Sequence, residues 1–202
     1  GLITYVVWGM LTIYWKQLHH FNAFELIGWR ITASAAIMGA GLTLSKRWPH
    51  LRVLRHDHAL FLRVVAAASL LTVNWTAYVW AVVHDRVLET ALGYFIAPIG
   101  TVLVGVFVLH ETWRPAQRIA LGSAAVAVVV LTASYGHVPW LALAIAVSWT
   151  SYGYMKKQVP LSPVESMAAE SFVLVIPAVI LAVAMASRAD ARWRRKLRSN
   201  MP

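Results

Sequence analysis

The chain has 202 residues, of which 59% are apolar and only 13% are charged, and it contains no cysteine. A soluble domain is usually about 45–50% apolar and about 25% charged, so composition excludes an ordinary soluble protein, and the lack of cysteine excludes disulfide, thiolate zinc and iron–sulfur sites. The net charge of +10 fits basic loops beside anionic membrane lipid better than a nucleic-acid partner.

Seven apolar runs have roughly the 20 residues that a helix needs to cross the hydrocarbon core of a bilayer. In chain order they are Gly1–Leu18, Phe24–Leu44, Leu60–Val83, Val87–Leu109, Ile119–Tyr135, Val138–Met155 and Val164–Ala186. The chain begins inside the first run, from which we expect a natural N-terminus further upstream. The alternating pattern of barrel strands is absent from the sequence. We therefore predict an all-α integral membrane protein with seven transmembrane helices.

Basic residues are unevenly shared between the connections of these runs. One side of the predicted membrane holds nine of them: Lys46, Arg47, Arg52, Arg55, Arg63, Arg114, Arg118, Lys156 and Lys157. The opposite side holds Lys16, Arg30 and Arg86. Because basic residues accumulate in cytoplasmic loops, we predict a cytoplasmic N-terminus and a cytoplasmic connection over residues 45–58. With seven runs, residues 187–202 would lie on the side opposite the other basic connections, although they are basic as well. We interpret them as a basic tail outside the membrane-embedded part.

A short internal repeat links the first and sixth runs. The segment Trp8–Gln17 aligns with Trp149–Gln158 at a constant offset of 141, with three identities in ten positions. The offset covers five runs, an odd number, so the two copies must cross the membrane in opposite directions. Inverted repeats of this kind are a recurring architecture of secondary transporters.

Several strongly polar or ionisable residues interrupt the apolar runs, where they are costly and therefore usually face the bundle interior. They are Asn74, Trp75 and Tyr78 in the third run, Arg30 in the second, Glu170 in the seventh and Glu89 at the start of the fourth. One interpretation is a polar substrate pathway, in which Glu89 and Glu170 are the candidates for proton or cation coupling. The alternative is interhelical hydrogen bonding for Asn74 and snorkelling for Arg30.

Two prolines lie inside predicted helices. The ring of Pro98 removes the usual hydrogen-bond partner of the Tyr94 carbonyl, and Pro177 acts in the same way on Val173. The segment Gly93–Pro98 is therefore either an interrupted helix beside a cavity or only a bend. We predict that Asn74, Tyr78 and Tyr94 line one cavity, because the polar face and the freed carbonyl need polar neighbours.

The sequence gives no support for a metal site, a cofactor or catalysis. No two of the eight histidines lie four residues apart within one run, and no nucleophile–base grouping or phosphate-binding loop is present. A membrane-embedded enzyme is therefore disfavoured. A seven-helix receptor or opsin is a further alternative, but the last run, Val164–Ala186, has no lysine that would hold retinal.

Motifs in a fixed order resemble the RarD branch of the EamA, or drug/metabolite, transporter superfamily. They are Tyr14–Lys16, Asn74-Trp75, Trp80–Val82, Leu88–Pro98, Pro139–Leu143, Tyr152–Lys157 and Glu170 ahead of Pro177. The run Leu88–Pro98 is the specific one. The resemblance implies a ten-helix transporter of the bacterial inner membrane, built from two inverted five-helix repeats around a cavity, which moves small metabolites or drug-like solutes.

On this scheme residues 1–137 form the first five-helix repeat and residues 138–186 the first two helices of the second. Residues 187–202 resemble nothing in the family, from which we expect a C-terminally truncated or frame-shifted chain. The incomplete repeat would leave a polar groove open, or covered by a second copy in a homodimer. A fragment that does not transport by itself is therefore an alternative reading of the same sequence.

Overall fold

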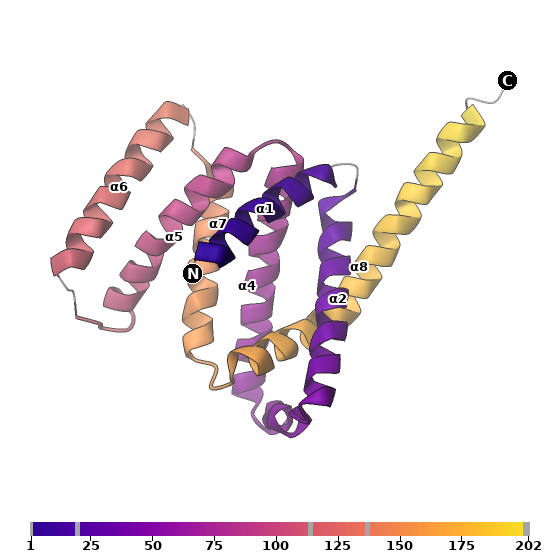
Figure 1. The fold of residues 1–202 in the computed structure, drawn as a ribbon, viewed down its shortest axis with the longest axis horizontal. Helices are drawn as coiled ribbons and strands as arrows, with labels where there is room; N and C mark the ends of the chain where they lie inside the picture. The colour runs from indigo at the N-terminus through magenta and orange to yellow at the C-terminus, as the bar shows by residue number, and fades with distance from the viewer. Residues whose placement is uncertain (1, 19–20, 113–114, 136–137, 200–202) are drawn as a thin grey trace. The chain divides into compact units, whose positions relative to one another are not determined.

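The computed structural model describes residues 2–18, 21–112, 115–135 and 138–199, and all regular structure in these ranges is helical (Figure 1). The helices are α1 (Leu2–Gln17), α2 (Ala23–Leu44), η1 (Trp48–Arg52), α3 (Val53–His56), α4 (His58–Val83), α5 (Val87–Phe107), α6 (Pro115–Tyr135), α7 (Trp140–Lys157) and α8 (Pro163–Ser199). The predicted all-α class is confirmed for the described residues. Each of the seven apolar runs contains one helix.

Three of these helices are long and apolar enough to cross a membrane by length and composition: His58–Val83, Val87–Phe107 and Pro163–Ser187. Two features differ from the prediction. The basic connection over residues 45–58 contains the short helices η1 and α3, and α8 continues as a helix beyond Ala186 to Ser199. Both α5 and α8 continue through their prolines, so Gly93–Pro98 is not an interrupted helix.

Local signals in the sequence explain where several helices begin and end. The Asn22 side chain caps α2 by accepting from the Phe24 amide at 2.9 Å, and Asp57 accepts from the Leu60 amide at 2.9 Å at the start of α4. Such caps satisfy amides that have no partner within the helix. The residues after α2, α4 and α5 have positive φ, as is common at helix C-termini; they are Lys46, Asp85 and His110.

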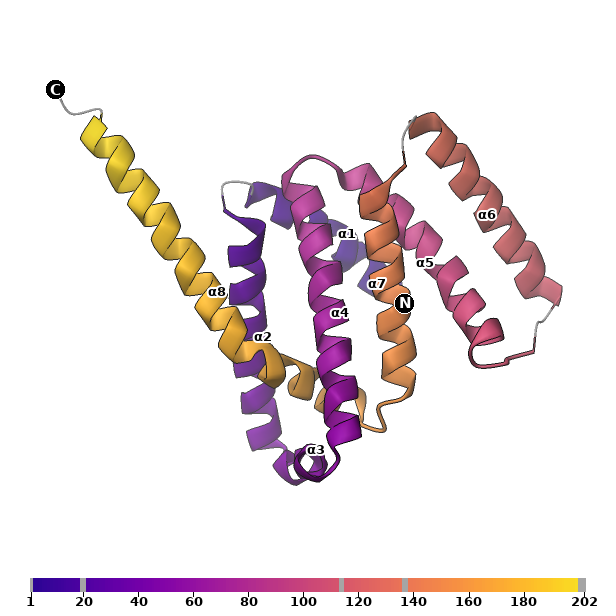
Figure 2. The same ribbon diagram turned by 180° about the vertical axis from the view of Figure 1, so that it is seen from behind.

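The chain divides into two compact units. The first unit comprises Gly1–His19 and Ala66–Pro160, and the second comprises His20–Val65 and Leu161–Pro202. In the first unit α5 lies between α6 and α7, and both neighbours contact it (Figure 2). In the second unit α2 packs against α8. Helix α4 contributes its first turns to the second unit and the rest of its length to the first.

Glycines allow the closest helix contacts in each unit. A Cβ at Gly93 of α5 would lie 2.9 Å from the Ala142 carbonyl oxygen of α7, and one at Gly100 would lie 2.5 Å from the Thr150 hydroxyl. In the second unit, a Cβ at Gly28 of α2 would lie 2.8 Å from the Ala178 carbonyl oxygen of α8. Small residues that let backbones approach are the usual means of packing helices in lipid.

Candidate functional site

A hydrogen-bonded amide joins three helices at the centre of the first unit. Asn74 of α4 is 0% exposed, and its Nδ2 donates to the Ile145 carbonyl at 2.9 Å and to the Ser148 hydroxyl at 3.1 Å on α7. Its Oδ1 accepts from the Tyr94 hydroxyl of α5 at 3.3 Å. A buried amide is costly unless its donors and acceptor are used, and here both kinds of group are used.

Tyr94 also belongs to a group of five aromatic side chains in contact with one another. We refer to them as the aromatic cluster: Trp8, Trp75, Tyr78, Tyr94 and Trp149. Their ring centroids lie 5.7–6.4 Å apart in these contacts, and most pairs meet edge to face. Such geometry is the favoured one for aromatic pairs. The Tyr78 hydroxyl also shares a hydrogen bond of 2.8 Å with the Thr12 hydroxyl of α1.

Two cavities adjoin the aromatic cluster. The smaller has about 20 Å³, room for about one water molecule, and is lined by Trp8, Leu11, Trp15, Trp75, Tyr78 and Tyr94. The larger is an open groove of about 630 Å³, lined by Trp8, Tyr94, Ala97, Pro98, Thr101, Val102 and Trp149. Trp8 and Tyr94 line both, so they form the wall between the two spaces.

The lining of both cavities is largely apolar and aromatic, with a few polar groups and no charge. Among the described residues that line either cavity, none carries a charge. The indole N–H of Trp15 is buried beside the smaller cavity and has no hydrogen-bond partner in the described part of the chain. A ligand in these cavities would therefore meet aromatic faces, hydroxyls and one unsatisfied N–H donor.

The structure brings together Asn74, Trp75, Tyr78 and Tyr94 from the residues singled out in the sequence. Glu89 belongs to the same unit but lines neither cavity. It is 4% exposed, its Oε1 lies 2.5 Å from the Arg86 Nε, and its Oε2 has no hydrogen-bond partner among the described residues. Pro98 lines the larger cavity on α5.

Three further candidates belong to the second unit and are described within it. Arg30 is half-buried on α2. Glu170 is buried on α8, where its Oε1 accepts from the Ser166 hydroxyl at 2.9 Å. Pro177 lies inside the same helix. A single polar pathway through all of the predicted residues therefore remains a hypothesis.

Sequence reasoning missed several members of the site. The sequence marks Trp8 and Trp149 only as matching positions of the repeat, and no pattern in it singles out Thr12, Trp15 or Ser148 as site residues. These residues are hard to recognise as site residues in the sequence, because tryptophan is common at membrane interfaces and single hydroxyls are common within membrane helices. The repeat was the one pattern that marked both Trp8 and Trp149.

Ion pairs flank α5 at both ends. The Lys16 Nζ lies 3.0 Å from the Asp85 Oδ1 just before α5, and the Lys157 Nζ lies 2.7 Å from the Glu111 Oε1 just after it. The two lysines are 141 residues apart, so they occupy the same position of the repeat. All four side chains are exposed, as expected at the ends of membrane helices.

Comparison with known proteins identifies the family. Residues 1–133, more than half of the chain, match the EamA-like transporter family. The chain belongs to this family. The predicted resemblance to its RarD branch is also confirmed, and family membership together with the three apolar helices makes this a multi-pass membrane protein.

Three relatives show how far this similarity extends. RarD of Streptomyces exfoliatus is 40% identical over 89% of this chain and 57% of its own length. An uncharacterised transporter of Pseudomonas aeruginosa is 34% identical over 89% of this chain and 60% of its own, and RarD of Escherichia coli is 29% identical over 92% and 63%. The chain thus spans about three-fifths of the length of these relatives. No solved structure matches it.

Proposed function

We propose that the protein is a transporter that moves a small metabolite or drug-like solute across the bacterial inner membrane by alternating access. The observation that carries this proposal is the pair of uncharged, aromatic-lined cavities of the first unit, whose shared wall residue Tyr94 is bonded to Asn74. Relatives named as transporters support the same class, and we propose no catalytic reaction. The solute-facing residues are Trp75, Tyr78 and Tyr94, together with Trp8 and Trp149. Asn74 is buried and lines neither cavity, and it positions Tyr94 through their hydrogen bond.

The lining favours a solute that is uncharged or carries a diffuse positive charge. Aromatic faces bear the negative part of the ring quadrupole and attract organic cations. An anion would lose its hydration in the groove without gaining a countercharge, which is costly. The Trp15 N–H and the tyrosine hydroxyls would bind a polar group on such a solute.

We infer that the architecture is the ten-helix one, with residues 1–137 as the first inverted repeat and residues 138–186 as the beginning of the second. Two contacts support this. Trp8 and Trp149 occupy the same repeat position, and their rings lie 6.4 Å apart; a residue touches its own counterpart only near a twofold axis. Lys16 and Lys157, also counterparts, pair with acids at opposite ends of α5, as an inverted repeat requires.

The remaining predictions complete this proposal. The seven apolar helices span the membrane, the N-terminus and the connection over residues 45–58 are cytoplasmic, and residues 187–202 lie outside the bilayer. Glu89 and Glu170 are the candidates for proton or cation coupling, because both carboxyls are buried, and Arg30 lies along the pathway. A homodimer would cover polar surface that the seven helices leave open.

Vesicle transport tests the proposal. Because this chain spans about three-fifths of its relatives, we propose that it binds solute alone and transports when extended by the last helices of E. coli RarD. Radiolabelled benzyltrimethylammonium should enter vesicles of the extended protein saturably, and Asn74→Leu should abolish most of that uptake. Uptake no greater than in protein-free vesicles would refute a transporter with this site.

A further inference from the structure

A third cavity lies within the second unit. It is a groove of about 570 Å³ lined by residues of η1, α3, α4 and α8: Trp48, Leu51, Arg52, Leu54, Arg55, Phe61, Ala169, Phe172 and Val173. Seven of these nine residues are apolar, and the other two are arginines. We refer to this cavity as the basic groove.

The floor of the basic groove is apolar and partly open. Trp48 stacks on Phe172 with ring centroids 5.4 Å apart and an interplanar angle of 14°. Trp48 remains 44% exposed and Phe61 39% exposed, so aromatic surface faces the cavity. A floor of this kind suits a hydrocarbon chain, because it offers apolar contact without any polar group that must be desolvated.

The rim carries the charge. Arg52 and Arg55 are three residues apart in the turns formed by η1 and α3, and both are exposed. In the described part of the chain neither guanidinium group has a hydrogen bond or an ion pair, and none of the described residues lining the groove is acidic. Arginine presents a planar fork of donors that matches phosphate oxygens.

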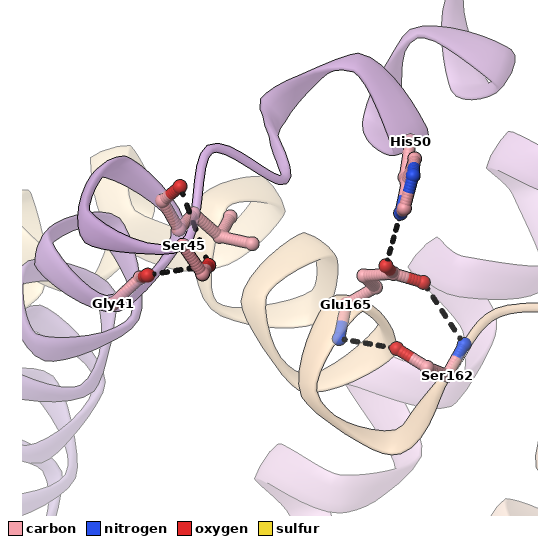
Figure 3. Close-up of polar contacts among 6 residues, drawn as sticks. Gly41, Ser45, His50, Ser162 and Glu165 are labelled. Atoms are coloured by element: carbon pink, nitrogen blue, oxygen red, sulfur yellow. Dashed lines mark hydrogen bonds and ion pairs between the residues drawn. The ribbon is translucent and has the colours of Figure 1, made fainter.

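Polar contacts beside the groove hold η1 in place, and Figure 3 shows those that join His50, Glu165 and Ser162. The His50 Nδ1 of η1 lies 2.5 Å from the Glu165 Oε1 at the start of α8. Glu165 also completes a capping box, in which its Oε2 accepts from the Ser162 amide at 3.1 Å and its own amide donates to the Ser162 hydroxyl at 3.4 Å. The Trp48 indole N–H donates to the Thr43 hydroxyl at 3.0 Å. These contacts fix η1 between the end of α2 and the start of α8.

We propose that the basic groove binds one anionic phospholipid. Its phosphate lies between the Arg52 and Arg55 guanidinium groups, and an acyl chain lies along Phe61, Phe172 and Val173. Charge complementarity selects an anionic head group, and the apolar floor selects a lipid over a free phosphate, which would gain nothing from it. Basic pockets at the ends of membrane helices are suited to such lipids. The proposal is independent of whether the first unit moves a solute.

The test is a lipid titration of the full chain in mild detergent, followed by native mass spectrometry. Phosphatidylglycerol and phosphatidylcholine with the same acyl chains are compared, because only the first is anionic. Inorganic phosphate at millimolar concentration is the third arm. Arg52→Gln/Arg55→Gln is compared with Lys46→Gln/Arg47→Gln, which removes the same charge from the same connection outside the groove. Arg52→Lys/Arg55→Lys keeps the charge and reports whether the turn still folds.

We expect one phosphatidylglycerol to bind more tightly than phosphatidylcholine. Each basic residue near anionic lipid contributes on the order of 1 kcal/mol, so the double glutamine variant should lose about tenfold or more in affinity. The control pair should change it less than about twofold, and the lysine pair should retain most of it. Equal affinity for both lipids, equal loss in the control pair, or displacement of the lipid by inorganic phosphate would each overturn the proposal.

Discussion

The two units of this protein treat buried polar groups differently. At the centre of the first unit the polar groups are neutral: the Asn74 amide bonds to a hydroxyl, a carbonyl and a phenol. In the second unit two buried carboxyls, Glu165 and Glu170, lie in the first turns of α8. A charge deep in lipid is far costlier than a neutral group that is hydrogen-bonded. The first unit also buries a carboxyl at a helix start, Glu89 of α5. The contrast therefore lies at the centre of the first unit, where a neutral amide rather than a carboxyl joins the helices.

The largest effect should come from filling the close helix contacts on which both units depend. Gly93→Ala and Gly28→Ala each place a Cβ within 3 Å of a backbone carbonyl oxygen, and such overpacking costs about 1–3 kcal/mol. Gly153→Ala and Gly41→Ala, where nothing lies within 4 Å of the added carbon, should be neutral or stabilising by up to about 1 kcal/mol. Unfolding in detergent followed by circular dichroism measures the difference.

Each unit contributes one crowded and one open glycine, so the loss of unfolding free energy can be compared between the two units. Equal unfolding free energies for all four variants would show that these helices do not pack as closely as the structure has them. Destabilisation in only one unit would show that the other tolerates helix displacement.

The second-largest loss of unfolding free energy should come from replacing a buried polar group. Asn74→Leu removes the hydrogen bonds that link α4 to Tyr94 of α5 and to Ile145 and Ser148 of α7. Interhelical hydrogen bonds in membranes contribute roughly 0.6 kcal/mol each, up to about 1.7 kcal/mol. We expect a loss of roughly 1–2 kcal/mol of unfolding free energy. Glu170→Gln should change it little, because an amide oxygen can still accept from the Ser166 hydroxyl. The same detergent unfolding assay applies to both.

A larger loss in Glu170→Gln than in Asn74→Leu would reverse the proposed contrast between the units. It would mean that the Glu170 carboxyl of the second unit contributes more to the unfolding free energy than the Asn74 amide of the first.

The smallest effect should come from the ion pairs at the ends of α5. Asp85→Asn and Glu111→Gln each remove one exposed partner, and exposed pairs are usually worth about 0.2–1 kcal/mol. Because Lys16 and Lys157 are repeat counterparts, we expect similar losses at both ends, reduced by salt. Double-mutant cycles with Lys16→Gln and Lys157→Gln measure each pair. A strong coupling at one end and none at the other would argue against equivalent roles.

Much of the fold could be predicted from the sequence. The seven apolar runs coincide with seven helices because hydrophobic length is a strong signal in membrane proteins. The four-residue spacing of Asn74 and Tyr78 placed them on one helix face, and the structure brings Tyr94 to both. These residues were found because a polar group within an apolar run is rare enough to stand out.

Other features depend on tertiary contacts that no local pattern reveals. The sequence predicts residues 45–58 only as a basic connection, yet they include η1 and α3, and His50 pairs with Glu165, 115 residues away. The apolar span of α8, Pro163–Ser187, nearly coincides with the predicted run Val164–Ala186, but helical backbone continues to Ser199. The aromatic cluster joins residues from four helices, so Trp8 and Trp149 could be linked only through the repeat.

We propose that the aromatic-lined cavities of the first unit bind a solute without net negative charge. Equilibrium dialysis of the purified chain against benzyl alcohol, benzyltrimethylammonium and benzoate tests it directly, because the three probes share one ring and differ in charge. We predict saturable binding of the first two, weaker binding of benzoate, and loss of binding in Trp149→Leu but not in Trp140→Leu, whose side chain is 74% exposed. Preferential binding of benzoate, or equal losses in the two tryptophan variants, would contradict the account.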